Sequence, residues 1–350
     1  MKIAVINAGS SSLKYKLFLM PEGRVLESKI VEHIGEEGSS IQTHHDALTS
    51  LALEYDSIDA FGHRVVHGGE EFVSPTRIDD GVIEKIRALI PLAPLHNGAN
   101  LEGILVAKKE RPHTAQIAVF DTAFHSTMPA EAYRYALPQK SYTVDKIRRY
   151  GFHGMSHSYV SKKAAEMLKI EYSALNAITL HLGNGASICA IEGGVSIDTS
   201  MGFTPLEGLV MGSRSGDLDP AILLYMQREL GMSLDEVDRV LNKESGLMGL
   251  CGENDMRAIL SSQSESALLA QRVMVRRIQK YIGGYMALLG RVDVLVFTGG
   301  IGEHAAAIRE QVLASPLFGD LEVVVIETNE ELEIANEVFS VLKEEGLENG

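Results

Sequence analysis

The chain has 350 residues, of which 45% are hydrophobic and 23% charged, with a formal net charge of -15 at pH 7. Its length favours about two domains, its composition is typical of a globular protein with a large core, and its charge argues against a nucleic acid or an anionic membrane as partner. It has two cysteines, no signal-peptide core and no apolar run near the roughly 18 residues of a membrane helix, so we expect a cytoplasmic protein without structural disulfides.

The first predicted element is a β-hairpin near the N-terminus. Residues 3–7 form a short apolar run suited to a buried strand, and residues 13–18 alternate as a second strand. The turn between them, residues 8–12, is small and hydroxylated, so its backbone and its serines can approach phosphate oxygens. Lys14 adds a positive charge just beyond it. The spacing differs from that of a Walker loop, and an ordinary serine-glycine turn remains the alternative at this point.

The remaining pattern is typical of α/β domains. Asp121 follows one of the buried strands, where it could be a metal ligand, a general base or merely a capped strand end. Strands are expected at residues 58–63, 116–120, 293–297 and 321–326. Helices are expected at residues 79–90, 99–110, 156–168 with Ser156 as the N-cap, from Asp219 onward, 264–289 and 330–345.

The hairpin pattern returns at residues 176–191. An apolar strand there leads into His181-Leu182-Gly183-Asn184-Gly185 and then into a second strand. When Gly9 is set against Gly183, Asn7 falls opposite His181. Two strand–turn–strand units in one chain indicate a duplicated domain. Two such domains facing each other would bring both turns to one cleft, where each could hold part of a polyphosphate.

Two further stretches favour an anionic ligand. Residues 198–219 are glycine-rich and lack a regular period, but they are too apolar for disorder, so we expect a functional loop. This loop contains Arg214, and Arg64 lies in another glycine-flanked turn; two such arginines suit a ligand with several negative charges. A third glycine turn, residues 298–303, follows a strand and opens a helix, which favours phosphate.

Two pairs of histidines are spaced four residues apart, His63 with His67 and His153 with His157. On a helix such a pair can bind zinc. Neighbouring glycines disfavour a helix at both places, and neither has the glutamate of the zinc-protease motif. We therefore expect no zinc site.

Eight motifs, in the same order across almost the whole chain, resemble the acetate kinase family. They are NAGSSSLKYKLF, HRVVHGG, APLHNGAN, VFDTAFH, YGFHGMSH, HLGNGAS, DTSMGFTPLEGLVMGSRSGDLDP and FTGGIGE. The resemblance implies the fold of the superfamily of acetate and sugar kinases, Hsp70 and actin: two duplicated α/β domains with mixed five-stranded sheets, helices on both faces and a cleft between. The expected domains are 1–122, completed by a C-terminal helix at 331–350, and 123–330, which carries most of the nucleotide site.

The resemblance also implies an activity. The expected reaction is reversible, Mg²⁺-dependent transfer of the ATP γ-phosphate to acetate, by direct in-line transfer, with Mn²⁺ as a substitute metal and a homodimer as the assembly. Propionate kinase, with the same mechanism and a roomier pocket, is the close alternative. A non-transferring actin-like ATPase module is the alternative of another class, although such a module would have no reason to keep an apolar acyl pocket beside Arg64.

Individual roles follow from the matching positions. Asp121 matches the catalytic aspartate, His153 and Arg214 match groups that stabilise the transition state, and Arg64 matches the substrate-contacting arginine. The acyl pocket is expected from Val66, Leu95, Phe152 and Pro205, and the metal site from Asn7 and Glu330. The nucleotide is expected to contact Lys14, His181, Leu182, Gly183, Asn184, Gly185, Asp255, Met256, Arg257, Gly299, Gly300, Ile301, Gly302 and Glu303.

The chain departs from the family pattern in length and at one motif. It is shorter near residues 20–57 and between 304 and 322, and it has His304 where the family usually has asparagine, which bears on the detail of nucleotide contact.

The chemistry of the reaction agrees with the expected residues. Two like charges about 4 Å apart cost roughly 4 kcal/mol at an effective dielectric of about 20, and Mg²⁺, Arg64 and Arg214 would offset that repulsion. A carboxylate nucleophile is already ionised at pH 7, so Asp121 is expected to position metal or substrate rather than to accept a proton.

Overall fold

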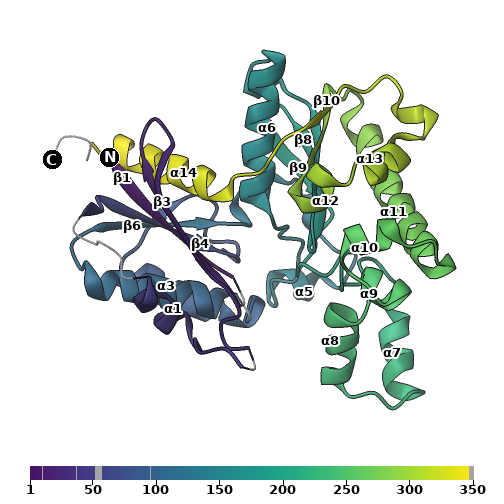
Figure 1. Cartoon of the computed structure of the whole chain (residues 1–350), viewed down its shortest axis with the longest axis horizontal. Coiled ribbons are helices and arrows are strands. Elements are labelled where there is room, and N and C mark those ends of the chain that lie inside the picture. Colours follow the sequence, from purple (N-terminus) through teal and green to yellow (C-terminus); the bar gives the residue numbers. More distant parts are fainter. Residues whose placement is uncertain (10, 37, 52–56, 95, 347–350) are drawn as a thin grey trace. The chain divides into compact units, whose positions relative to one another are not determined.

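The structure is a computed structural model that describes residues 1–9, 11–36, 38–51, 57–94 and 96–346 (Figure 1). The chain divides into two compact units. Unit 1 comprises Met1–Ser126, Gly154–Ser156 and Asn329–Gly350, and unit 2 comprises Thr127–His153 and His157–Thr328. The domain boundaries implied by the resemblance remain a prediction.

Unit 1 is built on a mixed sheet with the strand order β3-β2-β1-β4-β6-β5. The parallel strands β1, β4 and β6 are adjacent, and β2, β3 and β5 run antiparallel to their neighbours. The N-terminal hairpin predicted from the sequence is confirmed as β1 and β2. The strands are β1 (Lys2–Ala8), β2 (Leu13–Leu19), β3 (Arg24–Val31), β4 (Ala60–Val65), β5 (Thr76–Arg77) and β6 (Ala115–Phe120).

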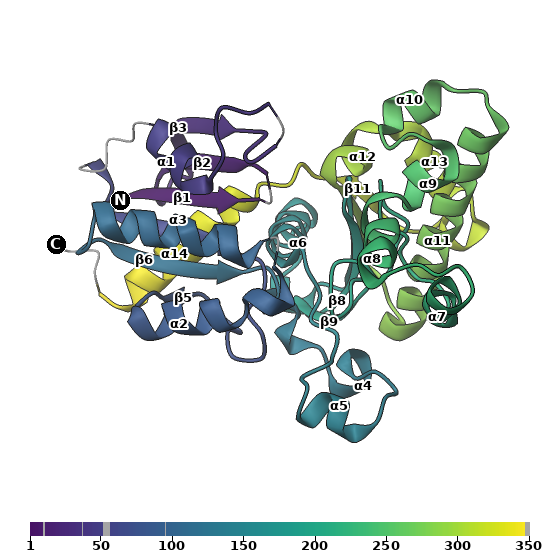
Figure 2. The same ribbon diagram turned by 90° about the horizontal axis from the view of Figure 1, so that it is seen from below.

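Helices cover both faces of this sheet (Figures 1 and 2). Alternate side chains of β1 enter opposite cores because successive residues of a strand point to opposite faces. Ala4 and Ile6 pack toward α1 (His44–Ser50) and α3 (Asn97–Glu110), whereas Ile3 and Val5 pack toward α14 (Glu330–Glu344). Beside α3 lies α2 (Asp80–Ala88), whose N-cap is Asp79, and a short 3-10 helix, Ile90–Leu92, follows it.

Unit 2 repeats the same topology with the order β11-β10-β7-β8-β9. In this order β7 takes the place of β1, β8 of β2, β9 of β3, β10 of β4 and β11 of β6, with the same parallel and antiparallel pairings. The predicted duplication is therefore confirmed, and the sheet of unit 1 differs only by the additional two-residue edge strand β5. The strands are β7 (Ala177–Leu182), β8 (Ala186–Glu192), β9 (Val195–Thr199), β10 (Val294–Thr298) and β11 (Val323–Val325).

Two long helices flank the sheet of unit 2 on opposite sides, α6 (Gly154–Leu168) and α11 (Glu265–Leu289) (Figures 1 and 2). The predicted helix 264–289 is confirmed, with Ser264 as its N-cap. The remaining helices of the unit are α4 (Ala130–Tyr133), α5 (Gln139–Thr143), α7 (Ala221–Arg228), α8 (Leu234–Lys243), α9 (Gly246–Cys251), α10 (Met256–Ser261), α12 (Gly299–His304) and α13 (Ala306–Leu313).

One predicted helix start is wrong. The N-cap of α6 is His153, with a left-handed φ of 58°, and Ser156 lies buried within the first turn. The first helical residue, Gly154, packs closely within unit 1: a Cβ there would lie 2.2 Å from the carbonyl oxygen of Asp121, so only glycine fits at this position.

No helix in the described ranges is both long enough and apolar enough to cross a membrane. The segment 198–219 forms no helix or strand after β9 ends at Thr199, as expected. Helix α1 begins at His44, whose ring lies 2.8 Å from the carbonyl oxygen of Gly9.

Candidate active site

Three polar side chains of unit 1 meet at one edge of its sheet. Asn7 lies near the carboxyl end of β1, Arg64 near that of β4, and Asp121 directly after β6. The three strands are parallel neighbours, so their carboxyl ends lie at the same edge, where α/β proteins commonly bind ligands. The sequence predicted functional roles for all three residues, and the fold brings them into direct contact.

Arg64 forms a bidentate ion pair with Asp121. Its Nε donates to Oδ1 at 3.1 Å and its Nη2 to Oδ2 at 2.6 Å, while Nη1 donates to Oδ1 of Asn7 at 3.1 Å. Burial raises the pKa of the Asp121 carboxyl, and the guanidinium opposes that shift. Burial likewise lowers the pKa of Arg64, but the carboxylates around it raise that pKa overall. Each partner therefore depends on the other for its charge.

Two adjacent glutamates at the start of α14 have different surroundings. Glu331 is buried; it accepts from Nδ2 of Asn7 at 2.9 Å and from Nζ of Lys16 at 3.1 Å. Burial raises the pKa of Glu331, but Lys16 and Asn7, with a smaller effect from Lys14, hold it below its ordinary value. Glu330 is half-buried, and its carboxylate makes no hydrogen bond or ion pair with any described residue. Glu330 is therefore available to an external ligand.

These residues fit Mg²⁺ shared with a ligand. Mg²⁺ prefers hard oxygen donors and is usually held by one or two carboxylates together with waters and substrate phosphates. The uncommitted carboxylate of Glu330 and the amide oxygen of Asn7 are such donors, and the charge of Glu330 acts on both Arg64 and Asp121. In the described part of the chain no three acidic, histidine or cysteine side chains form a metal cluster.

The other predicted site residues of unit 1 differ in their exposure to solvent. Val66 is 4% exposed and follows β4, and its N–H donates to Oδ1 of Asn100 at 3.0 Å. Lys14 is exposed on β2 directly opposite Asn7. Leu95 lies outside the described residues. Phe152 and Pro205 belong to unit 2, so the acyl pocket as a whole stays a prediction.

In unit 2, two predicted catalytic side chains converge on the turn between β7 and β8. A Cβ at Gly185 would lie 3.4 Å from Nε2 of His153 and 3.5 Å from Nη1 of Arg214. The ring of His153 stacks on that of His181 with centroids 4.2 Å apart. The turn itself is closed by a hydrogen bond from the Gly183 N–H to the Gly185 carbonyl, at 3.0 Å. Two donors from distant segments therefore face one glycine.

Arg214 is half-buried, and its guanidinium has no carboxylate partner among the described residues. Its Nη1 donates to the carbonyl oxygen of Pro205 at 3.1 Å and approaches the sulfur of Met211 at 3.8 Å. Burial lowers the pKa of this guanidinium. Because arginine carries five N–H donors, several remain available to an anion.

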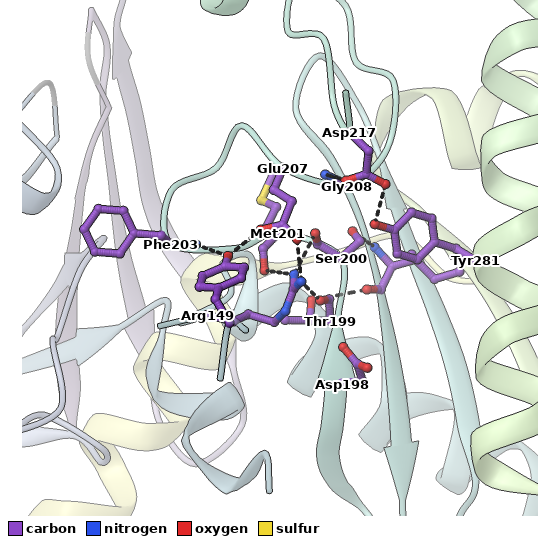
Figure 3. Close-up of polar contacts among 12 residues, drawn as sticks. Arg149, Asp198, Thr199, Ser200, Met201, Phe203, Glu207, Gly208, Asp217 and Tyr281 are labelled. Atoms are coloured by element: carbon purple, nitrogen blue, oxygen red, sulfur yellow. Dashed lines mark hydrogen bonds and ion pairs between the residues drawn. The ribbon is translucent and has the colours of Figure 1, made fainter. Parts of the chain in front are cut away.

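The loop that carries Pro205 is held by an arginine that the sequence analysis did not single out. Arg149 donates through Nη1 to three successive carbonyl oxygens, those of residues 199, 200 and 201, at 2.9, 3.0 and 2.9 Å (Figure 3). Its Nη2 pairs with Glu207, which also accepts from the hydroxyl of Tyr135. That hydroxyl accepts in turn from the N–H of Phe203 at 2.9 Å. These contacts join segments far apart in sequence, so no local pattern could have indicated them.

A hollow of about 350 Å³ lies beside the β7–β8 turn of unit 2. Its size suits a nucleoside, since small-molecule sites begin at about 300 Å³. It brings together three of the segments predicted to contact nucleotide. The lining residues are Gly183, Asn184, Asn254, Asp255, Met256, Arg257, Leu260, Gly300, Ile301, His304 and Ala305.

Other residues predicted to contact nucleotide lie outside that lining. They are His181, Leu182, Gly185, Gly299, Gly302 and Glu303 of unit 2 and Lys14 of unit 1. Glu303 braces the backbone instead: its Oε1 accepts from the N–H groups of Gly299 at 2.8 Å and Thr328 at 3.2 Å, and from the hydroxyl of Thr298 at 3.2 Å. The nucleotide contact of Glu303 remains a prediction. The hollow is also lined by His304, the residue that replaces the family's usual asparagine.

Comparison with known proteins places the chain in a family. Residues 41–338 match the Acetokinase family. An acetate kinase of Sulfurimonas denitrificans is 53% identical, in an alignment covering 98% of this chain and all of the relative. The crystal structure of Porphyromonas gingivalis acetate kinase has a TM-score of 0.90 at 40% identity, covering 97% of this chain and 99% of that one. A propionate kinase from Francisella tularensis has a TM-score of 0.89, also at 40% identity, with coverages of 96% and 98%.

These similarities extend over nearly the whole length of both partners in each comparison. They confirm the predicted fold class, two duplicated α/β domains on mixed sheets, and they confirm the family resemblance carried by the motifs. The chain belongs to the acetokinase family.

Proposed function

We propose that this protein is an acetate kinase, which transfers the γ-phosphate of ATP to acetate and forms acetyl phosphate and ADP reversibly. The observation that carries the proposal is the convergence of His153 Nε2 and Arg214 Nη1 on Gly185. The same turn contributes Gly183 and Asn184 to the hollow of nucleoside size. A nucleotide whose base and sugar occupy the hollow can direct its phosphates along the turn toward both donors.

In this proposal the protein supplies positioning and charge rather than covalent chemistry, which is what phosphoryl transfer chiefly requires. Arg214 and His153 stabilise the negative charge of the transferring group. Arg64 holds the acetate carboxylate, and Asp121 orients Arg64 through their two hydrogen bonds. Asn7 and Glu330 would hold Mg²⁺, which when bound neutralises phosphate charge.

The pocket for the acyl methyl group is assigned to Val66, Phe152 and Pro205, with Leu95. None of these side chains can hydrogen-bond an acyl chain, so chain length is selected by volume. The resemblance further supports a cytoplasmic homodimer, and Mn²⁺ as a substitute for Mg²⁺.

A second candidate is propionate kinase, which uses the same mechanism. The observation that favours it is the propionate kinase of Francisella tularensis, whose structure is as similar to this chain as that of the acetate kinase from Porphyromonas gingivalis. We prefer acetate because relatives at 53% and 46% identity over nearly the whole chain carry that name.

The proposal is tested by measuring ADP release and acyl phosphate in the same reaction. The purified protein is incubated with ATP and Mg²⁺, with or without acetate, and acyl phosphate is trapped as hydroxamate. We expect ADP release that depends on acetate and an equal amount of hydroxamate. ADP release without acetate and without hydroxamate would instead identify a non-transferring ATPase.

A further inference from the structure

His153 is connected to the interior of unit 2 by a chain of buried hydrogen bonds. Its Nδ1 lies 2.9 Å from the hydroxyl of Ser187 on β8. That hydroxyl lies 2.7 Å from Nε2 of His157 on α6, and Nδ1 of His157 lies 2.7 Å from the hydroxyl of Thr179 on β7. Ser187, His157 and Thr179 are all completely buried. This series of hydrogen bonds thus runs from Thr179 on β7 to the ring of His153, which lies beside Gly185.

The direction of this chain follows from counting hydrogen atoms. In the described part of the structure, the Thr179 hydroxyl has one hydrogen-bond partner, Nδ1 of His157, and the Ser187 hydroxyl has two, both histidine nitrogens. If Thr179 only accepted, its own hydrogen would be buried without an acceptor, which is unfavourable. Thr179 therefore donates to His157 Nδ1, His157 Nε2–H donates to Ser187, and Ser187 donates to His153 Nδ1.

We propose that Thr179, His157 and Ser187 act as positioning residues that hold His153 as a neutral ring with its proton on Nε2. Because Ser187 donates to Nδ1, that nitrogen must be an acceptor, and the ring keeps its N–H on Nε2. Nε2 is the atom that lies against Gly185. His153 therefore presents a fixed N–H donor beside Arg214 without adding a second buried positive charge there.

The inference rests on the proposed function for its catalytic meaning. A donor that is already in the correct tautomer needs no rearrangement when negative charge develops on the transferring phosphate, and such preorganisation lowers the barrier. If the relay is broken, His153 loses its fixed proton position but keeps its place at the N-terminus of α6.

A pair of substitutions at Thr179 separates this role from packing. Valine has the shape of threonine without the hydroxyl, whereas serine keeps the hydroxyl and leaves a methyl-sized gap. We expect Thr179→Val to lower kcat about 10- to 100-fold, the range for losing an outer partner of a functional histidine, with little change in KM. Thr179→Ser should stay close to wild type. A purely structural role predicts the reverse order.

The tautomer itself is measured by long-range ¹H–¹⁵N NMR of histidine-labelled protein, with His153 assigned from its missing signal in His153→Gln. We expect the wild type to show a neutral His153 with the proton on Nε2, and Ser187→Ala to show a mixture of tautomers. Ser196→Ala, at another buried serine of the same sheet, is the matched control and should leave the His153 signal unchanged.

The outcomes of the two measurements are distinguishable. A proton on Nδ1, a doubly protonated ring, or an unchanged His153 signal in Ser187→Ala overturns the relay, even if the protein makes acetyl phosphate. The expected spectrum supports the relay, even if the wild type makes none and the proposed function fails.

Discussion

Arg64 of unit 1 and Arg214 of unit 2 are both half-buried and both assigned to anions, yet their surroundings are opposite. Arg64 makes two hydrogen bonds to the carboxylate of Asp121, whereas Arg214 donates to one backbone carbonyl, that of Pro205. Nearby carboxylates raise the pKa of Arg64 against the effect of burial, and burial alone lowers that of Arg214.

The two arginines therefore differ in how their positive charge is compensated when no ligand is bound. The charge of Arg64 is already compensated within the protein, so this arginine is held in place before any substrate arrives. The charge of Arg214 has no acidic partner in the described part of the chain, so in the proposed reaction it would be compensated by the transferring phosphate. Removing Arg64 and removing Arg214 should therefore have different effects on stability and activity.

Removing Arg64 should have the largest effect, because it acts on both activity and stability. Arg64→Ala leaves the carboxylate of Asp121 buried and unpaired, which costs about 3–5 kcal/mol in free energy of unfolding. Turnover should fall by roughly 10³-fold or more. Urea unfolding and initial rates measure the two effects. The double variant Arg64→Ala/Asp121→Asn should regain stability but not activity; if it stays as unstable as the single variant, the ion pair is not what is lost.

Removing Arg214 should affect activity alone. Arg214→Ala leaves no carboxylate unpaired, so the unfolding transition should move little, while turnover falls by roughly 10³-fold or more, the scale of a lost arginine finger. Arg214→Lys should rescue poorly because lysine lacks the planar fork. Arg239→Ala, at an exposed arginine paired with Glu244, is the matched control and should keep its turnover. Near-normal turnover in a folded Arg214→Ala protein would remove this arginine from the mechanism.

Shortening Val66 should change substrate preference by a smaller factor. This side chain follows Arg64 by two residues and is buried, and its truncation makes room for about two methyl groups. Apolar pockets discriminate single methylenes by about 10- to 200-fold, so Val66→Ala should shift the kcat/KM ratio toward propionate within that range. The shift should arise from a higher KM for acetate. An unchanged ratio would place the acyl pocket elsewhere.

Neutralising Glu331 should have the smallest effect, a loss of stability that is present at neutral pH and disappears at acid pH. The folded pKa of Glu331 lies below its ordinary value of 4.5, so ionised Glu331 contributes stability above about pH 4.5 that is lost as pH falls through the lower folded pKa. In Glu331→Gln the free energy of unfolding should therefore depend less steeply on pH in that acid range. Glu22→Gln, at an exposed site, serves as the control and should keep the wild-type slope. An equal slope in wild type and Glu331→Gln would mean that Lys16 and Asn7 do not hold the carboxylate charged.

Local sequence pattern predicted much of the fold. The two hairpins and the helix at Glu265–Leu289 follow from hydrophobic period and capping residues that the sequence displays directly. The duplication followed from comparing Gly9 with Gly183, and all strands of the two sheets except β5 correspond in order. The start of α6 was missed: the helix begins at Gly154, whose close contact with Asp121 joins segments far apart in sequence and leaves no local pattern.

Candidate site residues could be predicted where they lie in a recognisable motif. Contacts between segments far apart in sequence could not be predicted. Arg64 and Asp121 were named from their turns, and the fold brings them into contact. The Arg149 contacts with the loop after β9, and the bracing role of Glu303, join segments that only the tertiary structure places together. Motif position alone also could not distinguish Glu330, which is available, from Glu331, which is already bonded.

The central claim is that this fold phosphorylates acetate, and a competition assay tests it most directly. The protein is incubated with ATP, Mg²⁺, hydroxylamine and equal concentrations of acetate, propionate and butyrate, and the three hydroxamates are separated and quantified. We predict acetohydroxamate in excess, propionohydroxamate at a lower yield within the discrimination of about 10- to 200-fold available to an apolar pocket, and butyrohydroxamate lowest. An excess of propionohydroxamate, or no hydroxamate at all, would contradict the account.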